Sequence, residues 1–513
     1  MTMSAQETAT PPRSFALSRW VVILFVGAAA LAVYFLVAPT IGHHASGYYR
    51  PRKFPFSYGY NRPLLLLFIP YALALIAWRR GARIGLGWLL GGAAVLHLAL
   101  LFAPLPQSQD MYQYLLYGRM QLIHPSAQLV QANPQAMMPF LHGMNPYTTQ
   151  PVAIWVDSWY SWIHWPLQTS VYGPVWSLLS LGVAKAAGSS ITTGFLLYKL
   201  VVLALDAAIV TMIVFAWRWR GDASGRDGQG AGWGVLAYAW NPLVLITVPL
   251  GGLVDVAVAA CLLGAYLARR RGRMGLATVL LTVASLIKVY AVIGLVLHLV
   301  LLLRDRGIRT AAKHGAMFAG IAAVLSVPYW AGIDTFRGLF HVADLSNKSL
   351  AGTVQKLLTP VLGGAGVPSP GDAAGAIVRW VGVGLLAWVV IWAIRRVRTE
   401  DDLWLSVLAV LSVYFLVTPW FLYWYLLTPL VLIAAMPRNR FTVPVLAFSG
   451  TSLITAAFPP WLAGQAVQAL ARYGPPVAIY MRGAPKREPV DDLTIDSPPP
   501  PAPALAAEPI PAG

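Results

Sequence analysis

Long apolar runs, separated by short polar or basic stretches, alternate along most of this 513-residue chain. Several of the runs approach or exceed the roughly 18 to 20 residues that a helix needs to cross a bilayer. The predicted segments are 20–38, 64–78, 86–105, 172–187, 194–217, 233–250, 252–268, 274–303, 314–331, 375–394, 403–418, 421–436 and 441–459. A soluble core could not bury so many, so the pattern predicts an all-α, polytopic membrane protein with about 12–14 transmembrane helices.

Two of these segments depart from a simple membrane span. The 274–303 stretch is long enough to form two short helices, with a break near Lys288. Basic clusters normally mark the cytoplasmic ends of membrane helices. Counting back from Arg269–Arg273 on the inside places Arg218–Arg226 inside as well, whereas counting forward from an inside N-terminus places it outside. One of the segments between 172 and 217 is therefore expected not to span fully. We predict that 172–187 is this segment, as a re-entrant or interfacial helix.

Composition and charge support the membrane class. Hydrophobic residues make up 58% of the chain and charged residues only 11%, against roughly a quarter charged in ordinary soluble proteins. The net charge of +18 would suit nucleic acid, but the basic residues lie in short clusters between apolar runs, as at Arg395–Arg398. This placement predicts a multi-pass membrane protein without a nucleic-acid partner. The single cysteine, Cys261, excludes an intrachain disulfide and a cysteine-rich metal site.

Two long hydrophilic connections, 106–170 and 332–374, are predicted to lie on the outer side of the membrane. The first contains a group of tryptophans, which favours an ordered loop. These are Trp155, Trp159, Trp162 and Trp165. They suit either stacking on sugar rings or an aromatic belt at the membrane interface. The Pro-rich tail reads as a disordered extension, so we divide the chain into a membrane-embedded domain, 1–483, and a tail, 484–513.

A carboxylate follows the third apolar run. Ser108 can cap a helix that continues through Met120, and Asp110 then lies in its first turn. We expect an amphipathic helix in the membrane interface, with Asp110 at the outer membrane edge. A carboxylate at that place is a candidate general base. The alternative is an ordinary acidic residue that interacts favourably with the helix dipole.

Several charged residues lie within the apolar runs, where they are costly and by default suggest a site or a pathway. Lys199 and Asp206 are spaced to share one side of a helix, and they suit either a site or a pair that locks helices together. Asp255 follows two glycines. Lys288, at the predicted helix break, is placed to meet an anionic phosphate, because helix ends nearby offer unpaired groups.

An ordered set of short motifs spreads across residues 108–425. It consists of Ser108-Gln109-Asp110-Met111-Tyr112, Asn145-Pro146-Tyr147, Tyr172-Gly173-Pro174, Asn241-Pro242 ahead of Asp255, then Lys288 and Pro419-Trp420. In this order the motifs resemble the bacterial polyprenyl-phosphate-mannose-dependent α-mannopyranosyltransferases. Those enzymes are integral-membrane glycosyltransferases of the GT-C type.

The resemblance implies an enzyme that transfers a hexose, mannose in that family, from a polyprenyl-phosphate donor to a glycan or glycolipid acceptor with inversion. Asp110 would be the general base, and Lys288, Arg119 and Lys348 would bind the donor phosphate. The residues implied in substrate binding are Tyr112, Asn145, Tyr147, Tyr172, Asp255 and Trp420. The protein would lie in the plasma (inner) membrane, with the site on its extracytoplasmic side. No cofactor is implied, and a divalent metal stays open.

One feature departs from the family pattern, which has a His-Asn pair directly before the aspartate corresponding to Asp255. This chain has Leu253-Val254 there, so the sugar and the acceptor stay open. The alternative function is a transporter or flippase for a lipid-linked sugar. Transporters often have broken helices at corresponding places in two halves. Only the break near Lys288 is evident, which favours the enzyme.

Overall fold

The computed structural model describes residues 65–81, 84–101, 110–221, 227–339, 349–457 and 464–483. Within these ranges the regular elements are helices, accompanied by two isolated bridges and no extended strand. The predicted all-α class is confirmed. The first apolar segment, 20–38, and the tail, 484–513, lie outside the described residues, as do Ser108 and Lys348.

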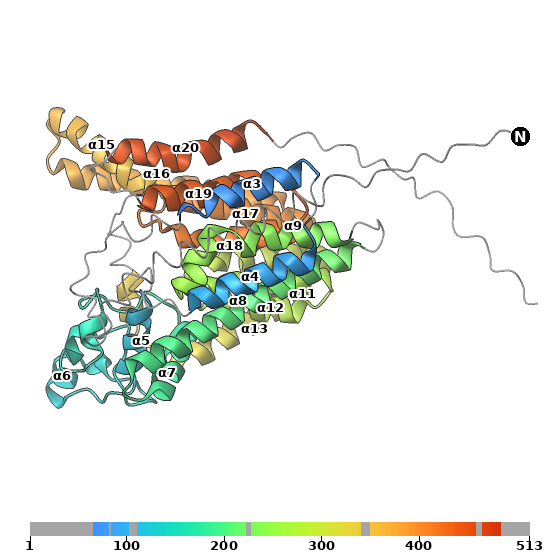
Figure 1. The fold of residues 1–513 in the computed structure, drawn as a ribbon. Helices are drawn as coiled ribbons and strands as arrows, with labels where there is room; N and C mark the ends of the chain where they lie inside the picture. Colours follow the sequence, from blue (N-terminus) through green and yellow to red (C-terminus); the bar gives the residue numbers. More distant parts are fainter. Residues whose placement is uncertain are drawn as a thin grey trace, which may run out of the picture.

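Most of the helices lie side by side in one elongated bundle (Figure 1). Its helices are α3 (Phe68–Arg79), α4 (Leu86–Leu101), α7 (Pro174–Ala187), α8 (Ile191–Gly221), α9 (Asp227–Ala239), α10 (Pro242–Leu245) with η6 (Ile246–Leu250), α11 (Asp255–Arg270), α12 (Met274–Ser285), α13 (Val292–Ser326), α15 (Leu350–Gly364), α16 (Pro370–Arg396), α17 (Glu400–Val417), α18 (Leu427–Ala435), α19 (Thr442–Ala457) and α20 (Gln465–Met481).

A smaller group of elements gathers at one end of the bundle, next to α7 (Figure 1). It comprises α5 (Asp110–Met120), α6 (Ala127–Ala132), η3 (Pro134–Ala136), η4 (Pro151–Ile154) and η5 (Tyr160–Trp162). Three single turns complete the described elements at other positions. They are η7 (Val289–Ala291), η8 (Val327–Tyr329) and η9 (Asp334–Phe336), and η10 (Tyr423–Leu426) leads directly into α18.

The centre of the bundle is formed by helices that are apolar on every side. All nine residues of α18 are buried, and α11 packs against α8, α12 and α18. A helix that is hydrophobic all round must be enclosed by other helices or by lipid. Since α11 and α18 are enclosed by protein, the helices around them are the ones left to face lipid.

Length and composition agree with a membrane protein. Among the described residues, α8 and α16 are long and apolar enough to cross a membrane, and α9 with the bent α10–η6 segment would make a third span. Six further helices or helix pairs of 10–17 residues are apolar but shorter. The larger number of spans that the sequence indicates stays a prediction. At about 1.5 Å per residue, α7 is some 21 Å long, below the roughly 30 Å of a bilayer core, which supports a helix that does not fully span.

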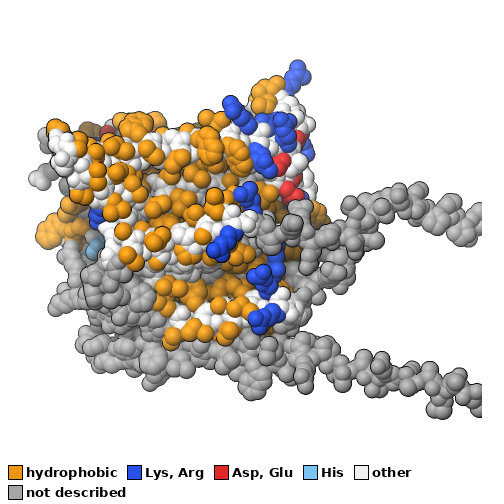
Figure 2. Space-filling model, turned by 90° about the horizontal axis from the view of Figure 1, so that it is seen from above, with side chains coloured by type: hydrophobic (Ala, Val, Ile, Leu, Met, Phe, Trp, Pro, Cys, Tyr) orange, Lys and Arg blue, Asp and Glu red, His pale blue; other side chains and the backbone are white. Residues whose placement is uncertain are grey.

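Charge is distributed unevenly along the bundle. Hydrophobic side chains cover most of the described face in Figure 2, whereas Lys and Arg side chains gather at one end of it. Basic residues occupy the last turns of α3, α11 and α16. This asymmetry is the one expected of cytoplasmic helix ends. We call this the basic end.

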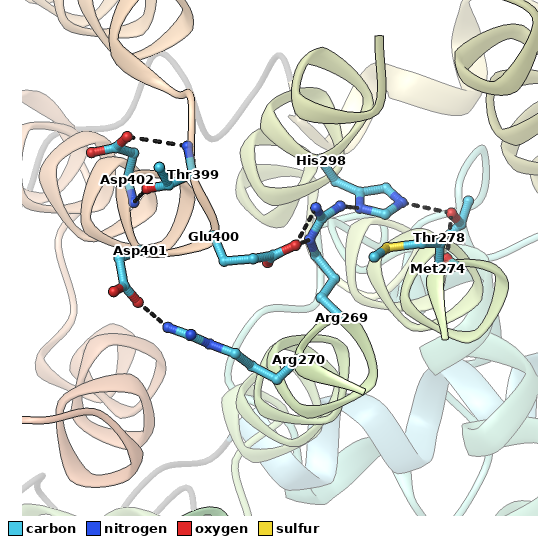
Figure 3. A network of polar contacts seen from close by, with 9 residues as sticks. All are labelled: Arg269, Arg270, Met274, Thr278, His298, Thr399, Glu400, Asp401 and Asp402. Carbon is cyan, nitrogen blue, oxygen red and sulfur yellow. Dashed lines mark hydrogen bonds and ion pairs between the residues drawn. The ribbon is translucent and has the colours of Figure 1, made fainter. Parts of the chain in front are cut away.

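A network of polar contacts ties four helices together at the basic end (Figure 3). The Arg269 guanidinium of α11 is buried and donates to both carboxylate oxygens of Glu400, at 2.9 and 2.6 Å. It also contacts His298 of α13, whose other ring nitrogen lies 2.8 Å from the Thr278 hydroxyl of α12. Arg270 pairs with Asp401 in the first turn of α17. Two-pronged guanidinium–carboxylate bonds are strong and directional, so they fix how these helices meet.

The predicted break near Lys288 is confirmed, because α12 ends at Ser285 and Lys288 itself is extended, with φ −141° and ψ 128°. The 332–374 connection was expected to be a hydrophilic loop, and this was wrong for its second half. There α15 packs against α16 and α20. The predicted segments also omit α20. Both helices carry internal prolines, and proline in a sequence argues against a helix. In the structure the two helices pack against each other.

The α5 helix was expected to be amphipathic, and the structure corrects this, whereas its place in the membrane interface stays a prediction. All its residues except Asp110 and Arg119 are buried, because α7 and α8 pack on it. The closest approach is at Gly118, where an added Cβ would lie 2.1 Å from the Ser180 carbonyl oxygen of α7. Glycine at position 118, which has no side chain, therefore allows α5 to pack this closely against α7.

We expect Gly118→Ala to destabilise the protein, because overpacking against a backbone carbonyl typically costs about 1–3 kcal/mol. The apparent melting temperature in detergent, followed by fluorescence-detected size exclusion, should fall. Gly182→Ala is the matched control: Gly182 lies within α7 with no atom within 4 Å of its added Cβ. That change should leave the melting temperature equal or higher, since alanine favours a helix over glycine by roughly 0.5–1 kcal/mol. Equal effects at the two sites would contradict the packing argument.

Candidate active site

A cavity of about 400 Å³ lies where α5, the 164–172 segment, the helix break at 288–290 and the 414–425 segment meet. One face of α5 contributes Asp110, Gln113 and Tyr117 to its lining. These residues are three and then four positions apart, which places them one above another on a helix. Lys288 and Trp420 also line the cavity. The cavity thus brings together a carboxylate, an ammonium group and several aromatic rings.

Lys288 is held by a carboxylate below the cavity. Its Nζ donates to both oxygens of Asp255, at 3.0 and 2.8 Å. The Asp255 side chain is fully buried, whereas the Lys288 side chain keeps 13% exposure. A buried carboxylate without a partner would be strongly unfavourable. The pair therefore fixes Lys288 at the cavity wall with Asp255 beneath it.

Aromatic residues surround this ion pair. The Tyr290 hydroxyl donates to Asp255 Oδ1 at 3.1 Å and lies 3.1 Å from the Thr428 hydroxyl of α18. Lys288 Nζ lies 4.4 Å from the ring centre of Tyr425 and 5.9 Å from that of Tyr172. Such cation–π contacts favour an ammonium group when water is partly excluded. The ammonium is thereby oriented from several sides before any ligand binds.

The Tyr172-Gly173-Pro174 motif caps the helix break that carries Lys288. The backbone N–H of Gly173 donates to the Ile287 carbonyl at 2.9 Å. An added Cβ on Gly173 would lie 2.0 Å from the Leu286 carbonyl oxygen, so only glycine permits this approach. Pro174 then begins α7, where its missing N–H costs nothing. The motif therefore places Tyr172 at the cavity beside Lys288.

Tyr172 is anchored from the first loop as well. The Tyr147 hydroxyl donates to the Tyr172 carbonyl oxygen at 2.7 Å. Burial, and after it the neighbouring Asp110 carboxylate, raise the pKa of the Tyr172 hydroxyl well above its usual value. Tyr172 therefore stays protonated at neutral pH, where it can donate a hydrogen bond but cannot serve as a base.

The structure brings four of the proposed site residues into the cavity lining. These are Asp110, Lys288, Tyr172 and Trp420. Asp255 acts from below through Lys288, and Tyr147 supports Tyr172. Asn145 is buried away from the cavity, where its amide donates to the Tyr329 carbonyl at 3.1 Å.

Arg119 and Tyr112 do not line the cavity, in contrast to the roles assigned to them. Arg119 lies near the end of α5, where it pairs with Asp157 at 3.1 Å and donates to the Gly188 carbonyl. Tyr112 is buried between Trp162 and Phe195. The reason is helical periodicity: neither residue is spaced to share the face of α5 that carries Asp110. Lys348, the third proposed phosphate ligand, lies outside the described residues.

Comparison with known proteins indicates the class of protein to which the chain is similar. Residues 171–419 match the family described as Glycosyltransferase family 87. Alpha-(1->6)-mannopyranosyltransferase A of Mycobacterium tuberculosis (strain ATCC 25618 / H37Rv) is 26% identical over 415 residues, which cover 76% of this chain and 75% of that protein. No solved structure matches significantly. The chain is a membrane glycosyltransferase. The resemblance to a mannosyltransferase family is confirmed, and neither match points to a transporter.

The family match covers only part of the glycosyltransferase's cavity. It includes Tyr172, Asp255 and Lys288 but begins after Asp110 and ends before Trp420. Sequence reasoning assigned no role to several lining residues. These are Gln113, Gln168, Tyr290 and Tyr414. The spacing of Gln113 from Asp110 was the one available signal, whereas the others come together only through the fold.

Lys199 and Asp206 do not pair with each other in the glycosyltransferase. Lys199 Nζ donates to the carbonyl oxygen of Leu101 at the end of α4, at 2.9 Å. Asp206 pairs with His97 at 2.7 Å and accepts from the Tyr238 hydroxyl at 2.8 Å. Both residues thus join α8 to neighbouring helices. Their position supports a structural role rather than a second site.

We expect Lys288→Met to destabilise the glycosyltransferase more than Asp255→Leu. Loss of Lys288 strands a fully buried carboxylate, for which we expect a cost of about 3–5 kcal/mol. Loss of Asp255 leaves an ammonium group at a cavity where water can solvate it. The double variant should recover most of the loss, because two apolar groups can pack together. Apparent melting temperatures of the three variants in detergent test this order, and the reverse order would contradict it.

Proposed function

We propose that this glycosyltransferase moves a hexose from a polyprenyl-phosphate donor to a glycan or glycolipid acceptor, with inversion and with Asp110 as general base. Its similarity to a mannopyranosyltransferase favours mannose as the hexose. The observation that carries the proposal is the shared cavity, in which Asp110 and Lys288 line one space enclosed by aromatic rings.

The reaction needs a base for the acceptor hydroxyl and a cation for the departing phosphate. The Asp110 carboxylate takes the proton of an acceptor hydroxyl, and that oxygen attacks the anomeric carbon of the donor sugar. The bond between the anomeric carbon and the phosphate oxygen breaks, and the polyprenyl phosphate leaves with the electron pair. Lys288 stabilises the charge that develops on this phosphate.

Charge in the cavity favours a single phosphate group. Within the described residues, Lys288 is the one Lys or Arg in the lining. Its ammonium has three N–H donors, and Asp255 accepts two of them. One donor then remains for a phosphate oxygen, and the Tyr172 hydroxyl next to it can add another. Arg119 is engaged with Asp157, so the phosphate role rests on Lys288, with Lys348 as a further candidate outside the described residues.

The location of the cavity supports a site on the extracytoplasmic side of the plasma membrane. The cavity is bordered by α5, which lies at the end of the bundle away from the basic end (Figures 1 and 2). The last turns of α3, α11 and α16 mark the basic end, and basic residues favour the cytoplasm. A donor with a polyprenyl chain in a multi-pass protein would then present its phosphate from the bilayer to Lys288.

Asp110→Asn should lower kcat for mannose transfer from polyprenyl-phosphate mannose by about 10²- to 10⁴-fold, the usual loss when a general base is removed. Because asparagine keeps the size of the side chain, KM for the donor should change little. Radiolabel transfer by the purified protein in detergent measures both constants. Asp334→Asn is the control, since Asp334 forms an ion pair with Arg337 outside the cavity lining. Full activity of the Asp110 variant would move the base elsewhere.

The product should have the opposite anomeric configuration to the donor. Retention through a covalent intermediate needs a second carboxylate as nucleophile. Within the described lining, Asp110 is the single carboxylate, while Asp255 is fully buried under Lys288. One base and a direct displacement therefore predict inversion. The one-bond carbon–hydrogen coupling at the anomeric centre of the product, read by NMR, decides the matter, and a retained configuration would overturn the single-displacement mechanism.

A further inference from the structure

Trp165 combines a fixed backbone with an open side chain. Trp165 lines the cavity, and 39% of the residue is exposed. Exposure alone does not distinguish it, because Trp88 is 63% exposed, but its place in the cavity lining does. The other tryptophans of the first loop differ from it. Trp159 is buried at 1% exposure, and Trp155, at 69%, lies outside the cavity lining.

Gln113 holds the backbone of Trp165 at both of its polar groups. The Gln113 amide nitrogen donates to the Trp165 carbonyl oxygen at 3.2 Å, and the Trp165 N–H donates to the Gln113 carbonyl oxygen at 3.4 Å. This paired arrangement uses one donor and the acceptor of the side-chain amide. Gln113 is therefore engaged with protein backbone, and its role at the cavity is to position Trp165.

A second bond anchors the same segment one turn further along α5. The Tyr117 hydroxyl donates to the Gln168 carbonyl oxygen at 2.7 Å. Gln113 and Tyr117 share a helix face with Asp110. The face that carries the proposed base thus also fixes the 165–168 segment at two points, so the separation of Trp165 from Asp110 is set by one rigid element.

The neighbouring rings support Trp165 without stacking on it in parallel. Trp420 meets it at a centroid distance of 6.2 Å and 76°, and His164 at 5.0 Å and 89°. Edge contacts of this kind hold a ring in place. An indole held in this way at a cavity wall suits the apolar C–H face of a pyranose ring.

We propose that Trp165 is the platform for the acceptor sugar, positioned by Gln113. This inference rests on the proposed function, and it assigns the acceptor to the side of the cavity that Trp165 forms. Gln113 lies one helical turn from Asp110, the base for the acceptor hydroxyl. Lys288, the cation for the donor phosphate, is instead held by Asp255 and by the rings of Tyr425 and Tyr172. The acceptor is then a glycan or glycolipid that presents a terminal pyranose to Trp165.

The test uses octyl α-mannopyranoside as acceptor and polyprenyl-phosphate mannose as donor, with KM determined for each separately. Trp165→Ala should raise KM for the acceptor about tenfold, which corresponds to about 1.4 kcal/mol of lost contact. KM for the donor should stay within about twofold of wild type, since the donor phosphate binds at Lys288. Trp165→Phe should fall between. A rise in donor KM alone, or no change in acceptor KM, would overturn the proposal.

The positioning role of Gln113 has its own test. Gln113→Leu should raise KM for the acceptor in the same direction, because it releases Trp165. Combined with Trp165→Ala, it should add nothing, since the two residues act as one unit. Additive effects would instead indicate that the two residues act independently, and would overturn the positioning role of Gln113. Trp155→Ala is the matched control, from the same loop but outside the lining, and it should leave both KM values unchanged.

Binding without turnover separates this inference from the proposed function. Saturation-transfer difference NMR with methyl α-mannopyranoside should give a signal with wild type that is lost in Trp165→Ala and kept in Trp155→Ala. If wild type transfers no sugar but shows this pattern, the platform stands and the proposed reaction fails. If wild type transfers sugar but Trp165→Ala keeps its signal and its acceptor KM, the platform is wrong and the reaction stands.

Discussion

The ion pair between Lys288 and Asp255 is the constraint on which the cavity depends. A carboxylate without solvent contact needs a cation within reach, and a cation can reach it only where the backbone between α12 and α13 leaves its helical path. The break supplies that geometry, and Gly173 supplies the close contact that caps it. A structural need of the buried aspartate thus places an ammonium group at the wall of a cavity lined by aromatic rings.

The α5 helix is the second organising element, because one of its faces combines two tasks. Asp110 stands at its first turn, while Gln113 and Tyr117 bind the backbone of the segment that carries Trp165. Helices hold side chains more accurately than loops do, so the proposed base and the proposed acceptor platform are positioned by the same rigid helix. The α5 helix is buried because α7 packs closely on it at Gly118.

Charges within the apolar runs divide into two groups when their partners are known. Lys199 and Asp206 join helices through carbonyl and histidine partners. Lys288, paired with Asp255, instead reaches the cavity. Charged residues of both kinds look alike in sequence. The energetic cost of a charge among apolar residues indicates that the residue has a role, but not whether the role is structural or functional.

The sequence by itself determined the all-α class and the break at Lys288, since apolar periodicity and isolated charges are local signals. It also singled out Asp110, Tyr172 and Trp420, which line the cavity. Only the tertiary structure decided that Arg119 pairs with Asp157 away from the cavity, that α15 and α20 are helices packed together, and that Tyr290 and Gln113 line the cavity. These outcomes depend on contacts between residues far apart in the chain, and the free energy of such contacts is not encoded in any single segment.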